Sequence, residues 1–388
     1  PPLAVYRGEI SLEAYLAGER RLTWATGTAR PDVQSCPVFV YSGMGPQWWA
    51  MGRELLDTEP QFRDTIQQCD AILRQYTPEW SLLTELRADE QNSRVLQTHI
   101  AQPALLAMQA GLTALWRSWG VRPAAVMGHS VGEIAAAHAA GILTLEEALL
   151  VAYHRSRLQR QKAGCGGMLA AGISLQEADA LLGLWGDQVS VAAYNSASSV
   201  TLAGDTDALE AIAETLVEEG RFAKMLRVEV PYHSPAMDSI LSEFQQCIGG
   251  IRPQAGEVPL VSTVTGKLLP GEKMTPAYWA ANVREPVRFH EGFGGLLAAG
   301  HDVFIEVGPH PVLAASMQEI AAETGRDPLV LPSLRRKEPD RLTMLGSLGR
   351  LYLAGCAIDW ERQFPAPGRF VRLPAYPWQR ELYWQESD

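Results

Sequence analysis

Short apolar runs alternate along this chain with longer segments whose apolar positions follow helical spacing. The first part predicts a buried strand over residues 38–41, a Gly-rich loop over 42–47, a helix over 49–56, a long apolar helix over 98–119 and a buried strand over 124–127. Pro103 is tolerable near the first turn of the long helix, and Gly120 ends it. Buried strands that alternate with helices are typical of an α/β fold.

The pattern changes between Gly167 and Val230, where strands become more frequent. It predicts, in order, a strand over 168–173, a helix over 175–184, strands over 189–194 and 199–204, a helix over 206–219 and a strand over 223–230. This βαββαβ order is typical of a ferredoxin-like unit. Outside it, a capping box at Thr144 and Glu147 predicts a helix to about Lys162, and residues 258–264 and 302–307 are predicted as further buried strands.

The two ends of the chain carry weaker patterns. Residues 1–33 show only an amphipathic patch at Leu12, Tyr15 and Leu16, which we interpret as part of a linker or peripheral element. Residues 373–384 are rich in Trp, Tyr and Pro and are expected to form a strap on the surface. The chain begins Pro-Pro-Leu, without a start Met or a signal pattern, which suggests a segment of a longer polypeptide.

Composition and charge narrow the classes of function. The 388 residues, 47% apolar and 20% charged, supply material for a sizeable core and two or more structural units. A net charge of -11 argues against nucleic-acid binding, and no apolar run of about 18 residues is present to span a bilayer. The five cysteines are scattered without Cys-x-x-Cys spacing, so we expect no disulfide framework, no metal site and a reducing, cytoplasmic location.

The most informative motif is a Gly-x-Ser-x-Gly turn over residues 128–132, between an apolar run and an Ala-rich helix predicted over 133–140. Gly128 and Gly132 stand where a sharp strand-to-helix turn leaves no room for side chains. Ser130 then projects at the helix N-terminus, where amide donors and the helix dipole stabilise an oxyanion. This context favours an acyl-transferring serine over a coincidental turn of small residues.

Such a serine needs a base, and His233 is the first choice among the eight histidines because it follows a predicted strand end and Pro231. The other histidines are His99, His129, His138, His154, His290, His301 and His310. Each is more often a structural histidine than a catalyst. Spacing does not show which of them meets Ser130 in space, so residue type alone leaves the choice open.

Several motifs occur in a fixed order along the chain. They are Gly43-Met44-Gly45-Pro46-Gln47, Gln102-Pro103-Ala104-Leu105, Gly128-His129-Ser130-Val131-Gly132-Glu133, Arg155, Pro231-Tyr232-His233-Ser234 and Glu306-Val307-Gly308-Pro309. Together they resemble the malonyl-CoA:acyl carrier protein acyltransferase family. The resemblance is closer to the acyltransferase domains of type I polyketide synthases and animal-type fatty acid synthases, and the tail over residues 373–380 resembles the linker that follows such domains.

This resemblance implies an α/β fold with a hydrolase-like core, a mostly parallel sheet and an inserted ferredoxin-like βαββαβ subdomain, flanked by linker segments. It divides the chain into the end of a ketosynthase-to-acyltransferase linker at 1–33, a core at 34–166 and 231–332, the subdomain at 167–230 and a post-acyltransferase linker at 333–388.

The resemblance also implies roles for individual residues. Ser130 is the nucleophile and His233 the general base and acid, while the backbone amides of Gln47 and Val131 form the oxyanion hole. Asn282 matches the residue whose main-chain carbonyl orients the histidine, so no Asp or Glu is assigned to the site. An ordinary helix C-cap or turn is the alternative for Asn282.

Arg155 bears on whether the acyl group of the substrate carries a carboxylate. It shares a helical face with Val151, Ala152 and Leu158, an apolar stripe where an unpaired guanidinium is expensive. The resemblance implies that it binds the free carboxylate of malonyl or a substituted malonyl, a target that a planar bidentate donor fits better than Lys does. The alternatives are a surface arginine and an internal pair with an acid such as Glu133.

Two further side chains are placed at the site by the resemblance. Gln102 resembles a side-chain amide near the acyl pocket, with helix capping as the alternative, and His129 is expected to line the site without doing chemistry. The basic run over residues 335–337 is either a solvated face or a contact for an acidic carrier protein.

The tetrapeptide Val230-Pro231-Tyr232-His233 bears on the choice of extender unit. It matches neither the His-Ala-Phe-His form typical of malonyl selection nor the Tyr-Ala-Ser-His form typical of methylmalonyl selection. The ring of Tyr232 is expected to crowd an α-substituent, and Val131 also resembles malonyl-type enzymes. We therefore predict malonyl-CoA. One methyl group is worth only about 1–3 kcal/mol, so methylmalonyl or an unusual extender stays open.

The predicted reaction is a ping-pong acyl transfer. Ser130 attacks a malonyl-type CoA thioester, and the phosphopantetheine thiol of an acyl carrier protein takes the acyl group from the resulting ester. The expected partners are that carrier protein and a neighbouring ketosynthase domain in the same polypeptide, and no bound cofactor or metal is needed. The rivals are a serine hydrolase or thioesterase and a catalytically idle docking domain.

Overall fold

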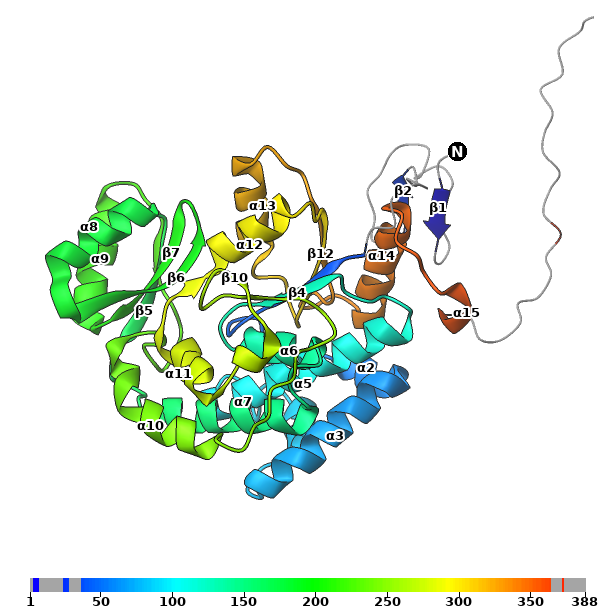
Figure 1. Cartoon of the computed structure of the whole chain (residues 1–388), viewed down its shortest axis with the longest axis horizontal. Coiled ribbons are helices and arrows are strands. Elements are labelled where there is room, and N and C mark those ends of the chain that lie inside the picture. The colour runs from blue at the N-terminus through cyan, green and yellow to red at the C-terminus, as the bar shows by residue number, and fades with distance from the viewer. Residues whose placement is uncertain (1–2, 7–23, 28–35, 364–371, 373–388) are drawn as a thin grey trace, which may run out of the picture.

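The computed structural model describes residues 3–6, 24–27, 36–363 and 372, and its centre is a six-stranded sheet (Figure 1). The strand order is β10-β9-β4-β3-β12-β13, and all neighbours pair in parallel except β10 with β9. The strands are β3 (Val38–Tyr41), β4 (Ala125–Gly128), β9 (Leu260–Ser262), β10 (Lys267–Leu268), β12 (Val303–Val307) and β13 (Leu329–Pro332). The predicted mostly parallel sheet is confirmed.

Helices cover both faces of this sheet because successive side chains of each strand point to opposite sides. Phe39 and Tyr41 pack into the larger core cluster, whereas Val38 and Val40 pack into a second cluster. The larger cluster joins α2 (Arg53–Thr58), α3 (Pro60–Tyr76), α4 (Leu82–Arg87), α5 (Thr98–Ser118), α6 (Gly132–Ala139) and α7 (Leu145–Arg160), and the second joins α12 (Phe289–Ala298) and α13 (Ala314–Glu323).

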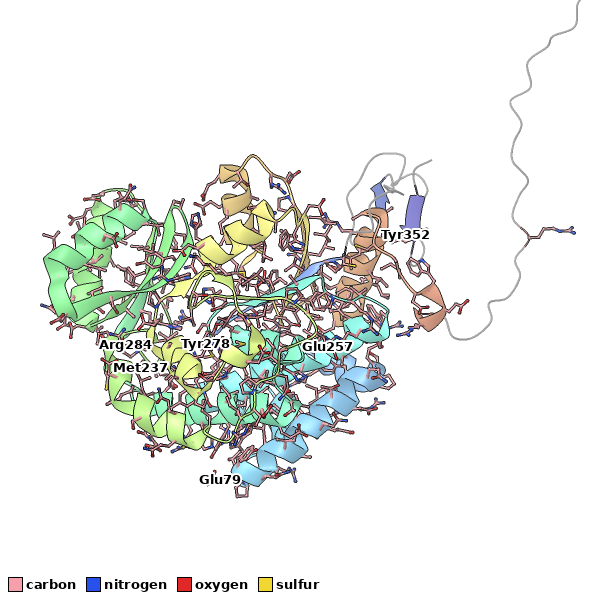
Figure 2. All side chains as sticks on the ribbon, in the orientation of Figure 1. Glu79, Met237, Glu257, Tyr278, Arg284 and Tyr352 are labelled. Carbon is pink, nitrogen blue, oxygen red and sulfur yellow. The ribbon has the colours of Figure 1, made fainter. Side chains whose placement is uncertain are left out.

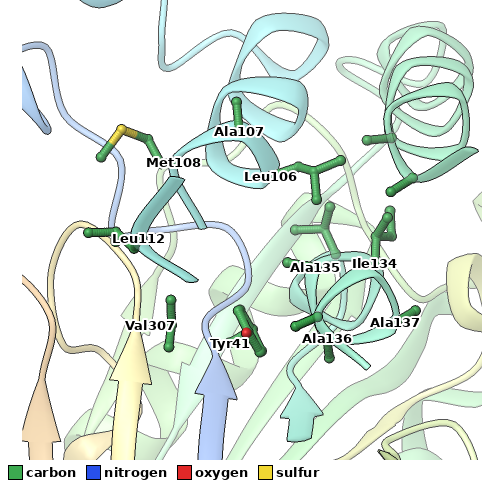
Figure 3. Close-up of a cluster of buried hydrophobic side chains, with 14 of the residues drawn as sticks. Tyr41, Leu106, Ala107, Met108, Leu112, Ile134, Ala135, Ala136, Ala137 and Val307 are labelled. Carbon is green, nitrogen blue, oxygen red and sulfur yellow. The ribbon is translucent and has the colours of Figure 1, made fainter. Parts of the chain in front are cut away.

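The apolar side chains of α5 and α6 meet over the carboxyl ends of the central strands. Figure 3 shows Leu106 and Leu112 of α5 and Ala136 of α6 around Tyr41 and Val307, which end β3 and β12. The carboxyl edge of an open α/β sheet is where such folds place their ligand sites. We therefore expect a ligand site at this carboxyl edge of the sheet.

A second sheet carries the predicted βαββαβ unit. Its strand order β6-β7-β5-β8 is antiparallel throughout, as a ferredoxin-like unit requires, and β11 (Val287–Arg288) adds a parallel strand to the outer edge of β6. The elements are β5 (Gly167–Ala171), α8 (Leu175–Trp185), β6 (Val189–Ser196), β7 (Ser199–Gly204), α9 (Thr206–Glu218) and β8 (Ala223–Met225).

The two largest differences between predicted and observed element boundaries have local reasons. The helix expected over 49–56 begins only at Arg53, because Gly52 has a left-handed φ of 71° that interrupts the spiral. The strand expected over 223–230 ends at Met225, because the chain then turns, with the amide of Val228 bonded to the carbonyl of Leu226. The capping box at Thr144 and Glu147 is present as predicted.

The remaining elements lie beside the core or at the ends of the described chain. They are the antiparallel pair β1 (Leu3–Tyr6) and β2 (Trp24–Gly27), and the helices α10 (Asp238–Cys247), α11 (Pro276–Arg284), α14 (Asp340–Leu353) and α15 (Trp360–Gln363). The patch at Leu12, Tyr15 and Leu16 and the strap over 373–384 lie outside the described residues. No helix in the described part of the chain is long and apolar enough to cross a membrane.

Candidate active site

Ser130 stands on a tight turn between β4 and α6, at the carboxyl edge of the central sheet. A Cβ atom on Gly128 would lie 2.3 Å from Cα of Glu133, and one on Gly132 would lie 2.4 Å from the carbonyl oxygen of Tyr41. Both glycines are therefore required by close backbone approach. Ser130 has a φ of 54°, a strained value for a residue with a side chain, which presents its hydroxyl at the amino end of α6.

His233 meets this serine although 103 residues separate them along the chain, and its Nε2 lies 2.7 Å from Oγ of Ser130. Its Nδ1 lies 2.8 Å from the carbonyl oxygen of Glu285. A carbonyl only accepts, so Nδ1 carries the proton and the lone pair of Nε2 faces the serine hydroxyl. Burial, with the positive charge of Arg155 added, lowers the pKa of His233 from 6.5 to about 3. The imidazole is thus neutral, the form a general base needs.

The residue that orients His233 is not the one predicted. The carbonyl of Glu285, rather than that of Asn282, accepts from the ring. The reason lies in the helix end: α11 stops at Arg284, so the carbonyl of its C-cap residue Glu285 has no partner further along the helix and is free for the imidazole. Figure 2 shows Tyr278 and Arg284 on this helix.

Asn282 instead contributes its side chain. Its Nδ2 donates to a carboxylate oxygen of Glu133 at 2.8 Å and to the carbonyl of Ser130 at 3.3 Å. Asn282 therefore links the turn that carries the nucleophile to the helix whose end holds His233.

Glu133 is the centre of this link and was not assigned by the sequence. Its fully buried carboxylate accepts from the amide of Thr263 at 3.1 Å, from the hydroxyls of Thr263 and Tyr278, and from Asn282. Burial raises its pKa to about 7, while the surrounding donors act in the opposite direction. An acidic residue on an otherwise apolar, Ala-rich helix was the available signal.

Arg155 reaches the same point from α7. Its guanidinium is 1% exposed, and Nη2 lies 3.1 Å from Oγ of Ser130. Nη1 donates to the side-chain oxygens of Gln102 at 2.7 Å and Gln159 at 3.3 Å. Among the described residues no Asp or Glu pairs with Arg155, and Glu133 acts on it only at longer range. Burial lowers its pKa to about 10, so it remains a cation at neutral pH.

Gln102 lies inside α5 and is fully buried, so it is not a helix cap. Gln159, one turn after Arg155, completes the amide pair and was missed, although its i+4 spacing from Arg155 was visible in the sequence.

Tyr232 is 5% exposed, and its hydroxyl lies 2.8 Å from Oγ1 of Thr98. This bond fixes the position of the Tyr232 ring.

The expected oxyanion donors lie in two segments. Val131 directly follows Ser130 at the start of α6, and Gln47 is in the loop after β3. In the described part of the chain neither amide donates to a backbone carbonyl. Arg336 donates to the carbonyl of Gln47 at 3.3 Å, which ties this loop to the basic run over 335–337.

His129 points toward the ferredoxin-like unit, where its Nε2 lies 3.0 Å from Oδ1 of Asn195 on β6. Burial lowers the pKa of His129, so this ring is also neutral. Among the described residues no group of three or more His, Cys, Asp and Glu side chains is arranged to hold a metal ion.

A nucleophile on a strained elbow, a neutral base and a buried cation without a carboxylate partner are together consistent with an acyl-transfer site. The family model described as the acyl transferase domain matches residues 38–358. The chain belongs to this acyl transferase family. The acyltransferase is 42% identical over 349 residues to polyketide synthase GfsB of Streptomyces halstedii, an alignment that covers 89% of this chain and 6% of GfsB.

Solved structures give the same assignment. The acyltransferase matches the acyltransferase domain from module 8 of the salinomycin polyketide synthase with a TM-score of 0.85 and 34% identity, over 90% of this chain and 82% of that one. It matches the acyl transferase domain of SpnD, in complex with 2-(pent-4-yn-1-yl)malonyl, with a TM-score of 0.76 and 30% identity, over 84% and 78% of the chains. The resemblance to polyketide synthase acyltransferases is confirmed.

Proposed function

We propose that this acyltransferase loads a malonyl-type extender unit onto an acyl carrier protein through an ester on Ser130. The observation that carries the proposal is the guanidinium of Arg155, buried without a carboxylate partner among the described residues and 3.1 Å from the nucleophile. A buried cation is costly unless paired, and the free carboxylate of a malonyl group supplies the pair. The similar SpnD domain is in complex with a substituted malonyl group.

In the first half-reaction, Nε2 of His233 takes the hydroxyl proton while Oγ of Ser130 attacks the thioester carbonyl. The amides of Gln47 and Val131 stabilise the oxyanion. When the carbon–sulfur bond breaks, His233 returns the proton to the CoA thiolate. In the second half-reaction His233 takes the proton of the phosphopantetheine thiol, which attacks the ester, and Ser130 leaves with that proton.

Malonyl-CoA is the proposed extender because Tyr232, which precedes His233 in the chain, is buried, and its ring leaves less room for an α-substituent than a small residue would. We further propose that a ketosynthase domain lies in the same polypeptide. Residues 34–166 and 231–332 then form the core, 167–230 the subdomain, and 1–33 and 333–388 the linkers. The small share of GfsB that the chain covers supports this arrangement.

The test is acylation of Ser130 by malonyl-CoA and acetyl-CoA, followed by the mass of the intact acyl-enzyme, in the parent and in Arg155→Ala. Removing a charge-assisted pair should lower the malonyl to acetyl ratio of kcat/KM by roughly 10- to 150-fold, because only malonyl offers a carboxylate. Equal losses for both substrates, or hydrolysis that outpaces transfer to a carrier protein, would contradict the proposal.

A further inference from the structure

The guanidinium of Arg155 is held along one edge only. Nη1 donates to Oε1 of Gln102 at 2.7 Å and to Oε1 of Gln159 at 3.3 Å, and Gln102 in turn donates from Nε2 to Oε1 of Gln159 at 2.7 Å. Both glutamine side chains are fully buried. This order of donors fixes the amide of Gln159, because the reverse orientation would turn its N–H groups toward two other donors.

The opposite edge of the same guanidinium is free. Nε of Arg155 has no hydrogen-bond partner in the described part of the chain, and Nη2 contacts only the hydroxyl of Ser130. In a planar guanidinium the Nε–H and Nη2–H bonds are parallel and form a bidentate donor that matches the two oxygens of a carboxylate. The amides at Nη1 therefore hold the guanidinium with Nη2 at the nucleophile.

The residue type at position 159 is unusual for its surroundings. A fully buried acceptor one turn from a buried arginine is a position where Glu would form an i,i+4 ion pair with Arg155 and would also accept from Gln102. Gln leaves its own Nε2 buried without a partner, which is itself unfavourable. The neutral amides of Gln102 and Gln159 thus hold Arg155 in place, and Nε2 of Gln159 is left without an acceptor.

Resting on the proposed function, we infer that Gln159 is a specificity-determining positioning residue: its neutral amide orients Arg155 by Nη1 while leaving the positive charge and the Nε/Nη2 edge for the carboxylate of the acyl substrate. Gln159 does not touch the reacting atoms. It acts through Arg155, by keeping internal negative charge away from it.

The test replaces Gln159 by Glu and compares acylation of Ser130 by malonyl-CoA and acetyl-CoA in the full chain. The new carboxylate pairs with Arg155 and competes with the substrate, so the malonyl to acetyl ratio of kcat/KM should fall about tenfold or more, with acetyl transfer largely kept. The melting temperature should stay close to that of the parent, because Glu has the same shape and its pairing with Arg155 offsets the burial of its charge. Gln161→Glu, which places the same charge on the exposed end of α7, is the matched control and should leave the ratio unchanged.

Gln159→Met gives an independent reading that does not depend on a buried charge. It removes the acceptor without neutralising Arg155, so malonyl transfer should lose severalfold in kcat/KM while acetyl transfer stays within about twofold. An unchanged ratio in Gln159→Glu, or equal losses for both substrates in both variants, would overturn the role of Gln159.

Arg155→Ala, measured in parallel, separates the role of Gln159 from the proposed function. If it lowers the ratio and Gln159→Glu does not, the inference about Gln159 fails and the proposed function stands. If the parent is not acylated by malonyl-CoA, the proposed function fails and the inference falls with it.

Discussion

Two residues of the site, Ser130 and His233, have positive φ values of 54° and 58°. Such backbone conformations cost about 1–3 kcal/mol each and persist only where the surroundings enforce them. Here the enforcement is the close approach around Gly128 and Gly132 for Ser130, and for His233 the bond from Nδ1 to Glu285. The backbone strain therefore coincides with the proposed nucleophile and base.

The protonation of His233 gives a prediction at this scale. Because burial lowers its pKa from 6.5 to about 3, the free enzyme keeps a neutral base throughout the neutral and mildly acidic range. The imidazole 15N chemical shifts of His233 should therefore stay those of a neutral ring from about pH 8 to pH 5, whereas the rate of acylation also responds to Glu133, whose pKa lies at about 7. An inflection of these shifts near the ordinary value of 6.5 would contradict the assignment.

The lowered pKa of His233 also makes the free energy of unfolding depend on pH. Between pH 6.5 and about 3 the unfolded chain binds a proton at this histidine and the folded chain does not. The contribution of His233 to the free energy of unfolding is therefore complete above pH 6.5 and falls as the pH drops through that window.

Tyr232 gives the prediction on size selection. Tyr232 is buried and precedes His233 in the chain, and replacing it by Ser should enlarge the pocket. We expect the parent to prefer malonyl-CoA, and Tyr232→Ser to shift the ratio of kcat/KM values toward methylmalonyl-CoA by roughly tenfold, the value of one methyl group.

The measurement for Tyr232 is a competition between both CoA esters with one carrier protein. Tyr232→Phe keeps the ring and loses only the hydroxyl group, so it should retain the preference of the parent. A parent that already prefers methylmalonyl-CoA would show that selection lies elsewhere in the pocket.

At the scale of elements, the site depends on how α6 and α11 are joined. Glu133 on α6 accepts from Asn282 and Tyr278 on α11 and from Thr263 just after β9, and α11 ends at the carbonyl that holds His233. Every group around this carboxylate is a donor. The nucleophile and its base are therefore positioned relative to each other through one buried acceptor.

Glu133→Gln should break this joint, since an amide directs N–H groups at donors. We expect the free energy of unfolding to fall by about 1–3 kcal/mol and kcat for acylation to fall more than KM rises. Urea unfolding and single-turnover acylation measure the two effects. Glu210→Gln, an exposed change on α9, is the control and should do neither. Full activity and stability of Glu133→Gln would remove the proposed coupling.

Across the molecule, polar and backbone contacts join the edge strand β6 of the ferredoxin-like unit to the core. β11 pairs with β6, His129 contacts Asn195, and the carboxylate of Glu319 on α13 accepts from the hydroxyls of Ser196 and Ser198 at the β6–β7 turn. The neighbour of the nucleophile is thus in contact with the second sheet.

Glu319→Ala should loosen that edge because the buried hydroxyl of Ser196 loses its acceptor. We expect a loss of about 1.5–3 kcal/mol in the stability of the unit, seen as faster amide exchange in β6 and β7 than in β3 and β4. Gln318→Ala, on the exposed side of the same helix, should leave exchange unchanged. Uniform acceleration in both sheets would instead show that they unfold as one unit.

The elements and turns that depend on local residue spacing could be predicted from the sequence. Short apolar runs, the capping box at Thr144 and Glu147 and the Gly-x-Ser-x-Gly turn each act within a few residues, so they predicted β3, α7, the ferredoxin-like order and the elbow at Ser130. The family motifs added His233 and Arg155, which the structure brings to Ser130.

Contacts between residues far apart in the sequence could be identified only in the folded structure. Which carbonyl holds His233 depends on where α11 ends, and which groups hold Arg155 depends on the packing of α5 against α7. Spacing in the sequence cannot report these contacts, because a carbonyl is present at every residue and a buried amide finds its partner only when two helices pack. The roles of Glu285, Glu133 and Gln159 therefore became visible only in the folded chain.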